Sequence, residues 1–213
     1  TCLPCNGNRR ARDRKGPARQ RRDPDLRARN WTGQTKHASR KFDRLPAPRP
    51  KCVMPPDRIA QAQLLFEEAL EAQMNGDYER AVELYRGSLA LHPTAEAHTF
   101  LGWTYHFQGK IEEAIGECKH AIRVDPDFGN PYNDIGAYLI ELGRLDEAIP
   151  WLEQAMAAKR YEPRQFPYFN LGRVYLAKGQ INRARELFQQ SLAIEPRYAL
   201  ARQALEKVRR MLN

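Results

Sequence analysis

The sequence carries an internal repeat with a spacing near 34 residues. Four glycines, Gly76, Gly109, Gly143 and Gly179, are 33, 34 and 36 residues apart, and each is followed five residues later by an alanine. A second aligned set lies seven residues earlier, at Leu101-Gly102, Ile135-Gly136 and Leu171-Gly172. Periods of about 20 to 50 residues are typical of solenoids, in which each unit packs on its neighbours. The spacing therefore predicts a stack of similar units.

Each unit has the pattern of two amphipathic helices separated by a glycine. In the second unit Leu101 and Tyr105 follow helical spacing, Gly109 interrupts it, and Pro126 ends the unit. We expect such glycines to take the left-handed backbone conformation that terminates a helix. The glycines of the first helix and the alanines of the second should let the two helices approach closely.

These positions resemble the tetratricopeptide repeat (TPR). That family has an aromatic residue before Leu-Gly, then Tyr, Gly, Ala, an aromatic residue, Ala and Pro. The fourth unit has Tyr168, Leu171, Gly172, Tyr175, Gly179, Ala184, Phe188 and Pro196. The first unit matches least, because Glu68 stands where leucine is usual. The resemblance predicts an all-α fold: a right-handed TPR helical solenoid of about four repeats with a C-terminal capping helix.

We expect the TPR domain to span residues 57–213, with repeats at about 62–94, 95–128, 129–164 and 165–197. The third repeat departs from the pattern, because its proline is displaced to Pro163 and its connection holds two extra residues. After Pro196 an amphipathic helix, about 198–212, should cover the end of the stack. Its predicted apolar stripe consists of Leu200, Ala204, Val208 and Met211.

Residues 1–56 differ from the rest in composition. Residues 1–58 hold 17 Lys and Arg against 5 Asp and Glu, whereas residues 59–213 hold 18 against 21. A segment rich in Arg and Pro with few apolar residues predicts a disordered basic arm. Three interpretations stay open: translated sequence ahead of a native start at Met54, an arm without a ligand, or an arm that binds nucleic acid. The Cys2–Cys5 pair lacks the second pair of a zinc site.

The sequence holds no motif for catalysis. It has no phosphate-binding loop, no dinucleotide fingerprint and no clustered His and Cys. We therefore predict that the protein is not an enzyme and has no catalytic residues, metal site or cofactor, and we interpret Cys118 as a core thiol. The longest apolar run, about 135–140, is far below the roughly 20 residues of a membrane helix. We expect a cytoplasmic protein.

The resemblance to TPR proteins implies that a groove lined by the first helices holds a peptide of a partner protein. Carried over position by position, the groove residues are Phe66, Leu70, Thr99, Phe100, Trp103, His106, Asn133, Asp134, Phe166, Phe169, Asn170 and Arg173, with Gln73, Glu96 and Asn130 as further positions. The alternative is that some of these aromatic residues pack between repeats. Trp103 should face the groove between Phe100 and His106 without supporting a neighbouring helix.

The composition of this groove narrows the expected ligand. Co-chaperone TPR proteins hold a C-terminal carboxylate with Lys, Asn, Asn, Lys and Arg. This chain has Phe66, Leu70, Phe100, Asn130 and Asp134 at those positions, and Asp134 would repel a carboxylate. Asn170, with Asp134 one unit earlier, resembles an asparagine ladder. We predict a scaffold or adaptor that binds another protein through the groove, not of the chaperone-tail type. The alternative is a basic-armed protein that binds nucleic acid or an anionic membrane surface.

Overall fold

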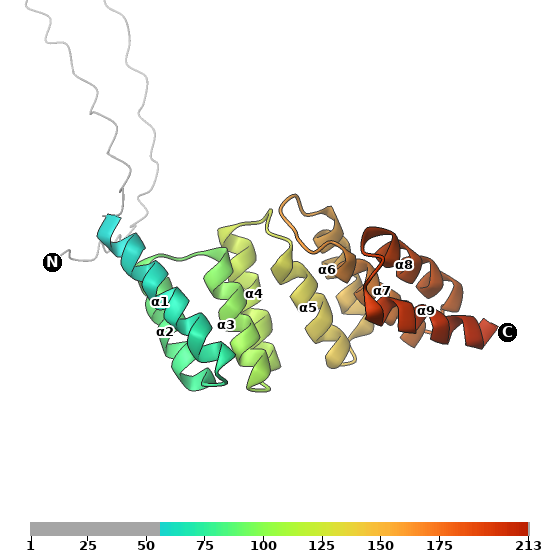
Figure 1. The fold of residues 1–213 in the computed structure, drawn as a ribbon, viewed down its shortest axis with the longest axis horizontal. Helices are drawn as coiled ribbons and strands as arrows, with labels where there is room; N and C mark the ends of the chain where they lie inside the picture. Colours follow the sequence, from blue (N-terminus) through green and yellow to red (C-terminus); the bar gives the residue numbers. More distant parts are fainter. Residues whose placement is uncertain (1–55, 213) are drawn as a thin grey trace, which may run out of the picture. The chain divides into compact units, whose positions relative to one another are not determined.

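The structure is a computed structural model that describes residues 56–212. The predicted basic arm, the interpretation of Met54 as a native start and the Cys2–Cys5 pair lie outside these residues. Within them the chain forms nine helices and no strand, in agreement with the predicted all-α solenoid (Figure 1). The helices are α1 (Pro56–Met74), α2 (Tyr78–Leu91), α3 (Ala95–Phe107), α4 (Ile111–Val124), α5 (Asn130–Glu141), α6 (Leu145–Ala157), α7 (Gln165–Ala177), α8 (Ile181–Ile194) and α9 (Ala199–Leu212).

The four repeat glycines end the first helix of each pair, as predicted. Their φ angles lie between 72° and 79°, in the left-handed region that a side chain disfavours. The residue after each glycine then closes the turn with its amide: Lys110 N, next to Gly109, donates to Tyr105 O at 2.9 Å. The same bond recurs in the other pairs, so each pair is an antiparallel hairpin of similar geometry.

Small residues let the two helices of a pair approach closely. A Cβ atom built on Gly136 would lie 2.5 Å from Leu152, and one built on Gly172 would lie 2.5 Å from Phe188. On Gly102 it would lie 3.2 Å from the backbone oxygen of Ala114. These contacts confirm the predicted reason for glycine at these positions.

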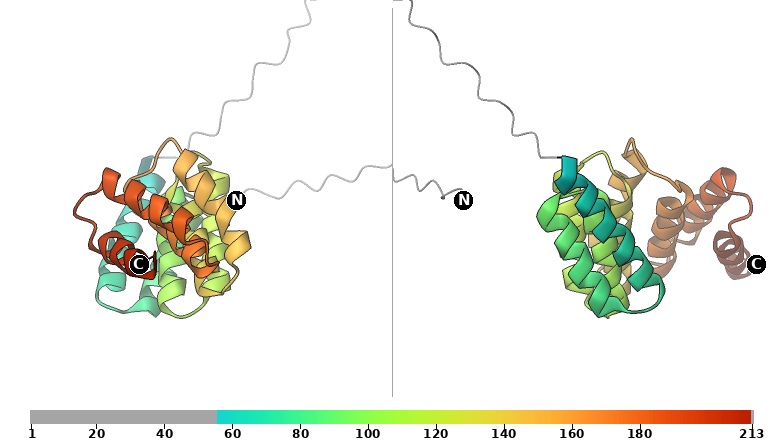
Figure 2. Two further views of the ribbon diagram at one scale, coloured as in Figure 1. Left: turned by 90° about the vertical axis from the view of Figure 1, so that its right-hand side faces the viewer. Right: turned by 60° about the vertical axis from the view of Figure 1, so that its left-hand side comes forward.

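The helix pairs stack side by side in the order of the chain. Each second helix contacts the first helix of the next pair. In addition α1 contacts α3 and α5 contacts α7, whereas successive second helices of the described stack have no contact of that extent. Figure 2 shows this stack from its C-terminal and its N-terminal side. We call the surface formed by α1, α3, α5 and α7 the first-helix face.

Helix α9 packs on α8 with a different stripe from the one predicted. Its buried residues are Ala201, Leu205 and Val208, whereas Leu200 and Met211 are 53% and 52% exposed. The prediction was wrong for these two residues and right for Val208. The sequence pattern allows two neighbouring stripes, and the direction from which α8 approaches selects the one that contains Ala201 and Leu205.

The connection from α6 to α7 folds back along the stack. Arg160 N donates to Asp127 O at 3.0 Å, and Gly129 N donates to Arg160 O at 2.9 Å, so the connection pairs with the one between α4 and α5. The Arg160 guanidinium lies 2.5 Å from Asp125 and 2.8 Å from Glu96 in α3. The next residue, Tyr161, is 4% exposed and packs on Gly129. The irregular third repeat thus brings Tyr161 close to the start of α5.

Candidate peptide-binding face

The twelve predicted groove residues all lie on α1, α3, α5 and α7. Nine of them are partly exposed: Phe66, Leu70, Phe100, Trp103, His106, Asp134, Phe166, Phe169 and Arg173. Thr99, Asn133 and Asn170 are buried. Thr99 donates its hydroxyl proton to Ala95 O at 2.8 Å within α3, so it stabilises its own helix and offers no contact to a ligand.

An aromatic row joins α1 to α3 on this face. The Phe66 ring lies 5.5 Å from the Phe100 ring and 5.6 Å from Tyr85, and Phe100 lies 4.6 Å from Trp103. Phe66, Phe100 and Trp103 pack against the core and also keep exposed surface. The two interpretations of these residues, packing and ligand contact, are therefore compatible.

Trp103 connects α3 to α5, contrary to our expectation that it would support no other helix. Its Nε1 donates a 2.6 Å hydrogen bond to Asp134 Oδ2. Phe100 flanks Trp103 as predicted, but the His106 ring stacks on Tyr138 at 4.7 Å and its Nε2 lies 2.9 Å from Glu141 Oε2. Helical spacing gives the direction of the indole but not the partner that the next repeat presents.

Two buried asparagines connect α5 to α7. Asn170 Nδ2 donates to Asn133 Oδ1 at 3.0 Å, and Arg173 Nη1 donates to Asn170 Oδ1 at 3.1 Å. Asn133 Nδ2 lies 3.5 Å from Asp134 Oδ1, at the limit of a hydrogen bond. A chain of polar side chains therefore runs from Trp103 to Arg173 across three repeats.

The Asp134 carboxyl has an unusual electrostatic environment. Burial raises its pKa from 3.8 to about 6, while the hydrogen bonds from Trp103 and Asn133 and the nearby His106 lower it. No Lys, Arg or His of residues 56–212 forms an ion pair with it. Asp134 is thus an acid whose pKa, about 6, is raised above its ordinary value by burial.

Tyr161 is a residue of this region that the sequence analysis missed. Among the described residues its buried hydroxyl has no hydrogen-bond partner. Burial raises its pKa, and the negative charge of Asp134 raises it further, so the two groups share one electrostatic environment. The two extra residues and the displaced Pro163 were the available signal, because an irregular connection is where a repeat can add a side chain.

The C-terminal end of the face is covered by the chain itself. The rings of Phe166 and Phe169 lie 5.4 Å and 5.1 Å from Tyr198, which immediately precedes α9. Phe169 also packs on Phe188 at 5.8 Å. These two predicted groove residues therefore hold the start of α9, which leaves the centre and the N-terminal part of the face open.

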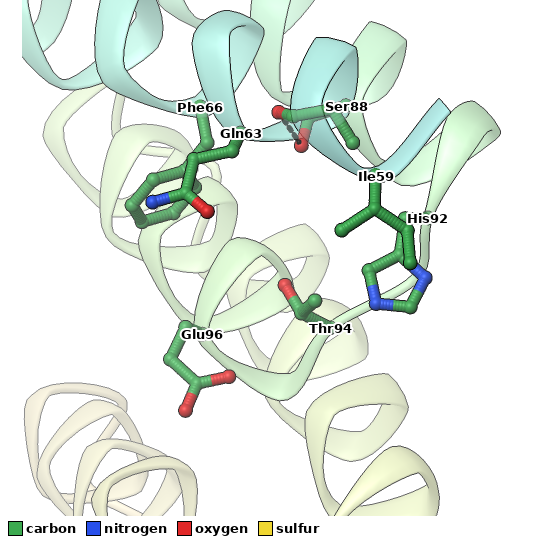
Figure 3. Close-up of a pocket in the computed structure, with 8 residues that line it drawn as sticks. Ile59, Gln63, Phe66, Ser88, His92, Thr94 and Glu96 are labelled. Atoms are coloured by element: carbon green, nitrogen blue, oxygen red, sulfur yellow. Dashed lines mark hydrogen bonds between the residues drawn. The ribbon is translucent and has the colours of Figure 1, made fainter. Parts of the chain in front are cut away.

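The N-terminal part contains a pocket of about 290 Å³ between α1, α2 and the start of α3 (Figure 3). Ile59, Ala62, Gln63, Phe66, Ser88, His92, Thr94 and Glu96 line it. Ser88 Oγ donates to Ala62 O at 2.7 Å and fixes one wall. The pocket shares Phe66 with the aromatic row, so it continues the open part of the face.

Other features of the described residues do not form a chemical centre. Residues 56–212 contain no cluster of three His, Cys, Asp or Glu side chains that could hold a metal ion. The Cys118 thiol is fully buried, and burial raises its pKa, which confirms that it is a core residue. In this part of the chain no helix combines the length and the apolar character that crossing a bilayer requires.

Related proteins share part of this chain. A type IV pilus assembly protein, PilF of Pseudomonas aeruginosa, is 30% identical over 120 residues, 56% of this chain and 48% of that protein. The photosystem I assembly protein Ycf3 of Synechococcus sp. (strain CC9311) is 30% identical over 46% of this chain and 63% of its own length. A small glutamine-rich tetratricopeptide repeat-containing protein of Mycosarcoma maydis is 32% identical over 43% of this chain and 26% of its own. The chain spans less than two thirds of each.

Solved structures share the fold. The structure of Pseudomonas aeruginosa PilF superposes with a TM-score of 0.67 over 71% of this chain and 69% of that one, at 24% identity. The MamA protein superposes with a TM-score of 0.59 over 70% and 80% of the two chains, at 23% identity. Residues 66–128 and 127–195 match two family profiles, each described as a tetratricopeptide repeat. These matches cover the helix pairs from α1 to α8, and the chain belongs to the tetratricopeptide-repeat family.

Proposed function

We propose that this protein is a non-enzymatic scaffold or adaptor that holds an extended segment of a partner protein on its first-helix face. The TPR fold supports a role in protein–protein interaction, because stacked repeats offer an extended concave surface. The observation that carries the proposal is the continuous row from Phe66 through Trp103 and Asp134 to Arg173. Along this row, an extended peptide would meet apolar side chains first and polar side chains next.

The side chains of the face favour a peptide with apolar anchors. Phe66, Phe100 and Trp103 are partly exposed, and fully burying a large apolar side chain is worth roughly 1.5–3 kcal/mol. Phe66, Leu70 and Phe100 take positions where a carboxylate clamp has polar or basic groups, and Asp134 repels an anion. The proposed ligand is therefore an internal segment rather than an acidic C-terminal tail.

The names of two relatives suggest the setting of this activity. PilF and Ycf3 are assembly proteins by name, for type IV pili and photosystem I respectively. By analogy we propose that this chain helps to assemble or hold together a larger complex of proteins. The identity of that complex does not follow from the likeness, because each relative matches only part of the chain.

Binding to the first-helix face can be tested with two substitutions that each introduce a positive charge. Ala137 lies one helical turn after Asn133 on α5 and is partly exposed, whereas Gln154 is exposed on the second helix α6. A peptide selected on the full chain from a random display library serves as the probe. Ala137→Arg should weaken its binding at least tenfold, whereas Gln154→Arg should leave it within about twofold. Equal binding to both variants, with unchanged melting curves, would place the binding surface elsewhere.

A further inference from the structure

Helices α7 and α9 lie at the C-terminal end of the described stack (Figure 1), and a pocket of about 330 Å³ lies between them. Its lining comes from α7 and then from α9, with Arg173, Leu176, Ala177, Lys207 and Met211. Tyr198 covers the first half of α7 at Phe166 and Phe169, whereas this pocket lies against the second half. The pocket therefore extends the first-helix face toward α9.

The repeat register shows that this end of the face is its basic end. The position six residues before the turn glycine is Leu70, Trp103, Ala137 and Arg173 in the four pairs, and Lys207 follows Arg173 by 34 residues. The position is apolar in the first three helices and cationic in the last two. Arg173 is also the only lysine or arginine in α3, α5 and α7. Positive charge at this position is thus confined to the pocket.

The Arg173 guanidinium is held in place by its own repeat. Its Nη1 donates to Asn170 Oδ1 at 3.1 Å, and its central carbon lies 6.0 Å from the centre of the Phe169 ring. A guanidinium carries several N–H donors in a planar fork that matches a carboxylate, and the contact with Asn170 uses one of them. Because the side chain is half-buried and already positioned, it loses little conformational entropy when a ligand binds.

The charge of the pocket itself is positive. None of its five lining side chains is acidic, whereas two of them are cations. Other lysines and arginines of the stack also lack an ion pair, but Arg173 and Lys207 line a single pocket from two helices. The acid nearest along α9, Glu206, lines the neighbouring pocket together with Arg210. Two converging cations favour an anion at this place.

The rest of the lining is apolar and accessible. Leu176 is half-buried, and Met211 is 52% exposed. Met211, which the sequence pattern placed in the stripe that packs on α8, lines this pocket instead. Its flexible side chain adapts to the shape of a ligand. The pocket therefore suits a group that combines an anionic end with an aliphatic stem.

We propose that this pocket is a subsite for an acidic side chain, aspartate or glutamate, of the partner segment held on the first-helix face. This inference rests on the proposed peptide-binding function and specifies one part of its ligand. The carboxylate of the segment accepts hydrogen bonds from Arg173 and Lys207, which are charge-assisted. Its aliphatic carbons lie against Leu176 and Met211. We call the pocket the acid subsite.

The acid subsite gives the bound segment one orientation along the stack. Phe66, Phe100 and Trp103 offer apolar contacts on α1 and α3, and Asp134 on α5 repels an acid at the centre of the face. The acid subsite attracts an acid between α7 and α9. The segment therefore carries apolar residues at the end that lies on α1 and α3, and an acidic residue at its other end.

The direct probe is a pair of blocked dipeptides added to the full chain. N-acetyl-glutamyl-leucinamide and N-acetyl-glutaminyl-leucinamide have almost the same shape, but only the first is charged. NMR follows the methyl signal of Met211, since Met211 lines the pocket. We expect saturable shifts with the glutamyl compound at millimolar concentration, and about threefold to tenfold weaker binding of the glutaminyl compound. Equal binding of the two compounds would overturn the proposal.

Substitutions on α9 separate the acid subsite from a general attraction of acids to a basic protein. Lys207→Gln removes one cation of the pocket at an exposed position and should weaken binding of the glutamyl compound about twofold to fivefold. Arg209→Gln removes the same charge from an exposed position of α9 outside the pocket, and it should change the affinity by less than about twofold. If both variants weaken binding equally, the attraction is diffuse and the subsite is ruled out.

Reversing the charge of the pocket gives a second readout that does not depend on a loss of binding. Lys207→Glu should abolish the preference for the glutamyl over the glutaminyl compound, and it should improve binding of N-acetyl-lysyl-leucinamide about twofold to fivefold. Circular dichroism and melting curves check that the variant is folded. A folded Lys207→Glu protein that still prefers the glutamyl compound would contradict the proposal.

The library-selected peptide distinguishes the two proposals. If Ala137→Arg weakens its binding but replacing each of its acidic residues by the amide does not, the function stands and the acid subsite fails. If Ala137→Arg leaves peptide binding intact while the glutamyl compound still requires Lys207, the pocket remains a site for a free acid and the peptide-binding function fails. Loss of affinity on replacing one acidic residue, absent in the Lys207→Glu protein, supports both.

Discussion

The two junctions along the first-helix face are built differently. Between α5 and α7 the helices contact each other, and neutral amides of Asn133 and Asn170 form a buried hydrogen bond. Between α3 and α5 the helices have no contact of that extent, and the link is a hydrogen bond from Trp103 to the carboxylate of Asp134. The first junction satisfies its own polar groups, whereas the second keeps an acid with unused acceptor sites.

This difference separates a junction held by neutral amides from a junction that holds a buried charge. A buried amide pair leaves little for a partner to gain, because both groups already have partners. A partly exposed carboxylate without a cation lowers its free energy when a cation arrives. The difference in chemistry therefore predicts a difference in response to mutation and to pH.

We call the buried Asn133–Asn170 hydrogen bond between α5 and α7 the amide junction. The largest expected effect comes from removing only one of its two amides. Asn133→Leu leaves the buried Asn170 Nδ2 without an acceptor, so the free energy of unfolding should fall by about 2–3 kcal/mol. The double variant Asn133→Leu, Asn170→Leu removes both groups and should recover at least half of that loss. Urea denaturation of the unchanged protein, Asn133→Leu, Asn170→Leu and the double variant measures the coupling, and additive losses would show that the amides do not depend on each other.

We call the α3–α5 link through Asp134 the charged junction. Its contribution to the free energy of unfolding should change with pH in the opposite sense from that of ordinary surface acids. Asp134 binds its proton more tightly in the folded chain, with a pKa of about 6, than in the unfolded chain, near 3.8. Its contribution therefore favours folding at low pH and is lost as the pH rises through 6, by at most about 3 kcal/mol in total. Asp134→Asn should remove this slope between pH 4 and pH 7.

The Asp134→Asn variant is needed as a reference because other acids change the free energy of unfolding with pH in the opposite direction. Hydrogen bonds from arginines lower the pKa of Asp125 and of Glu147, so their stabilisation is lost as the pH falls below their ordinary values. Unfolding measured in both proteins at each pH isolates the Asp134 contribution. Parallel pH curves for the two proteins would contradict the raised pKa.

A smaller effect is expected from removing the indole donor while keeping an aromatic ring. Trp103→Phe deletes the 2.6 Å hydrogen bond to Asp134 and should lower the free energy of unfolding by about 1–2 kcal/mol near pH 7. Since that bond lowers the Asp134 pKa, the variant should also raise this pKa above its value in the unchanged protein. Carboxyl NMR titration of both proteins gives the shift, and an unchanged pKa would mean that the bond is not formed in solution.

The sequence predicts contacts inside a helix pair better than contacts between pairs. The turn glycines and the small residues at Gly136 and Gly172 were predictable, because the residue type itself reports a positive φ angle or a close approach. The Trp103–Asp134 bond spans 31 positions and depends on the rotation from one repeat to the next, which residue types alone do not encode. The same reason explains the misplaced stripe of α9 at Leu200 and Met211.

Tyr161 was missed for a different reason. It lies in the insertion of the third repeat, where the family pattern gives no position to carry over. Its place beside Gly129 follows from the backbone pairing of Arg160 with residues 127–129, a contact between two loops that have no helical period. The irregular segment thus packs a buried tyrosine against the start of α5 that regular repeats do not provide.

The smallest expected effect concerns the surface ion pairs of Arg160, which lie near the junction between α3 and α5. The exposed Arg160 guanidinium joins Glu96 of α3 to Asp125 and lies 4.2 Å from the centre of the Phe128 ring. Arg160→Ala should lower the free energy of unfolding by less than about 1 kcal/mol, because solvent and salt screen exposed pairs. The loss should shrink further in 1 M NaCl.

Lys159→Ala is the control for this pair of ion pairs, since Lys159 is a neighbouring, more exposed cation that pairs only with Asp127. It should change the free energy of unfolding by less than Arg160→Ala at low salt. Arg160→Ala should also let the Asp125 pKa rise back toward its ordinary value, because the hydrogen bond from Arg160 is the main cause of its lowering. If Arg160→Ala instead costs as much as Asn133→Leu, the connection holds α3 to α5 more firmly than Trp103 does. The charged junction would then be held as firmly as the amide junction, and the comparison between the two would fail.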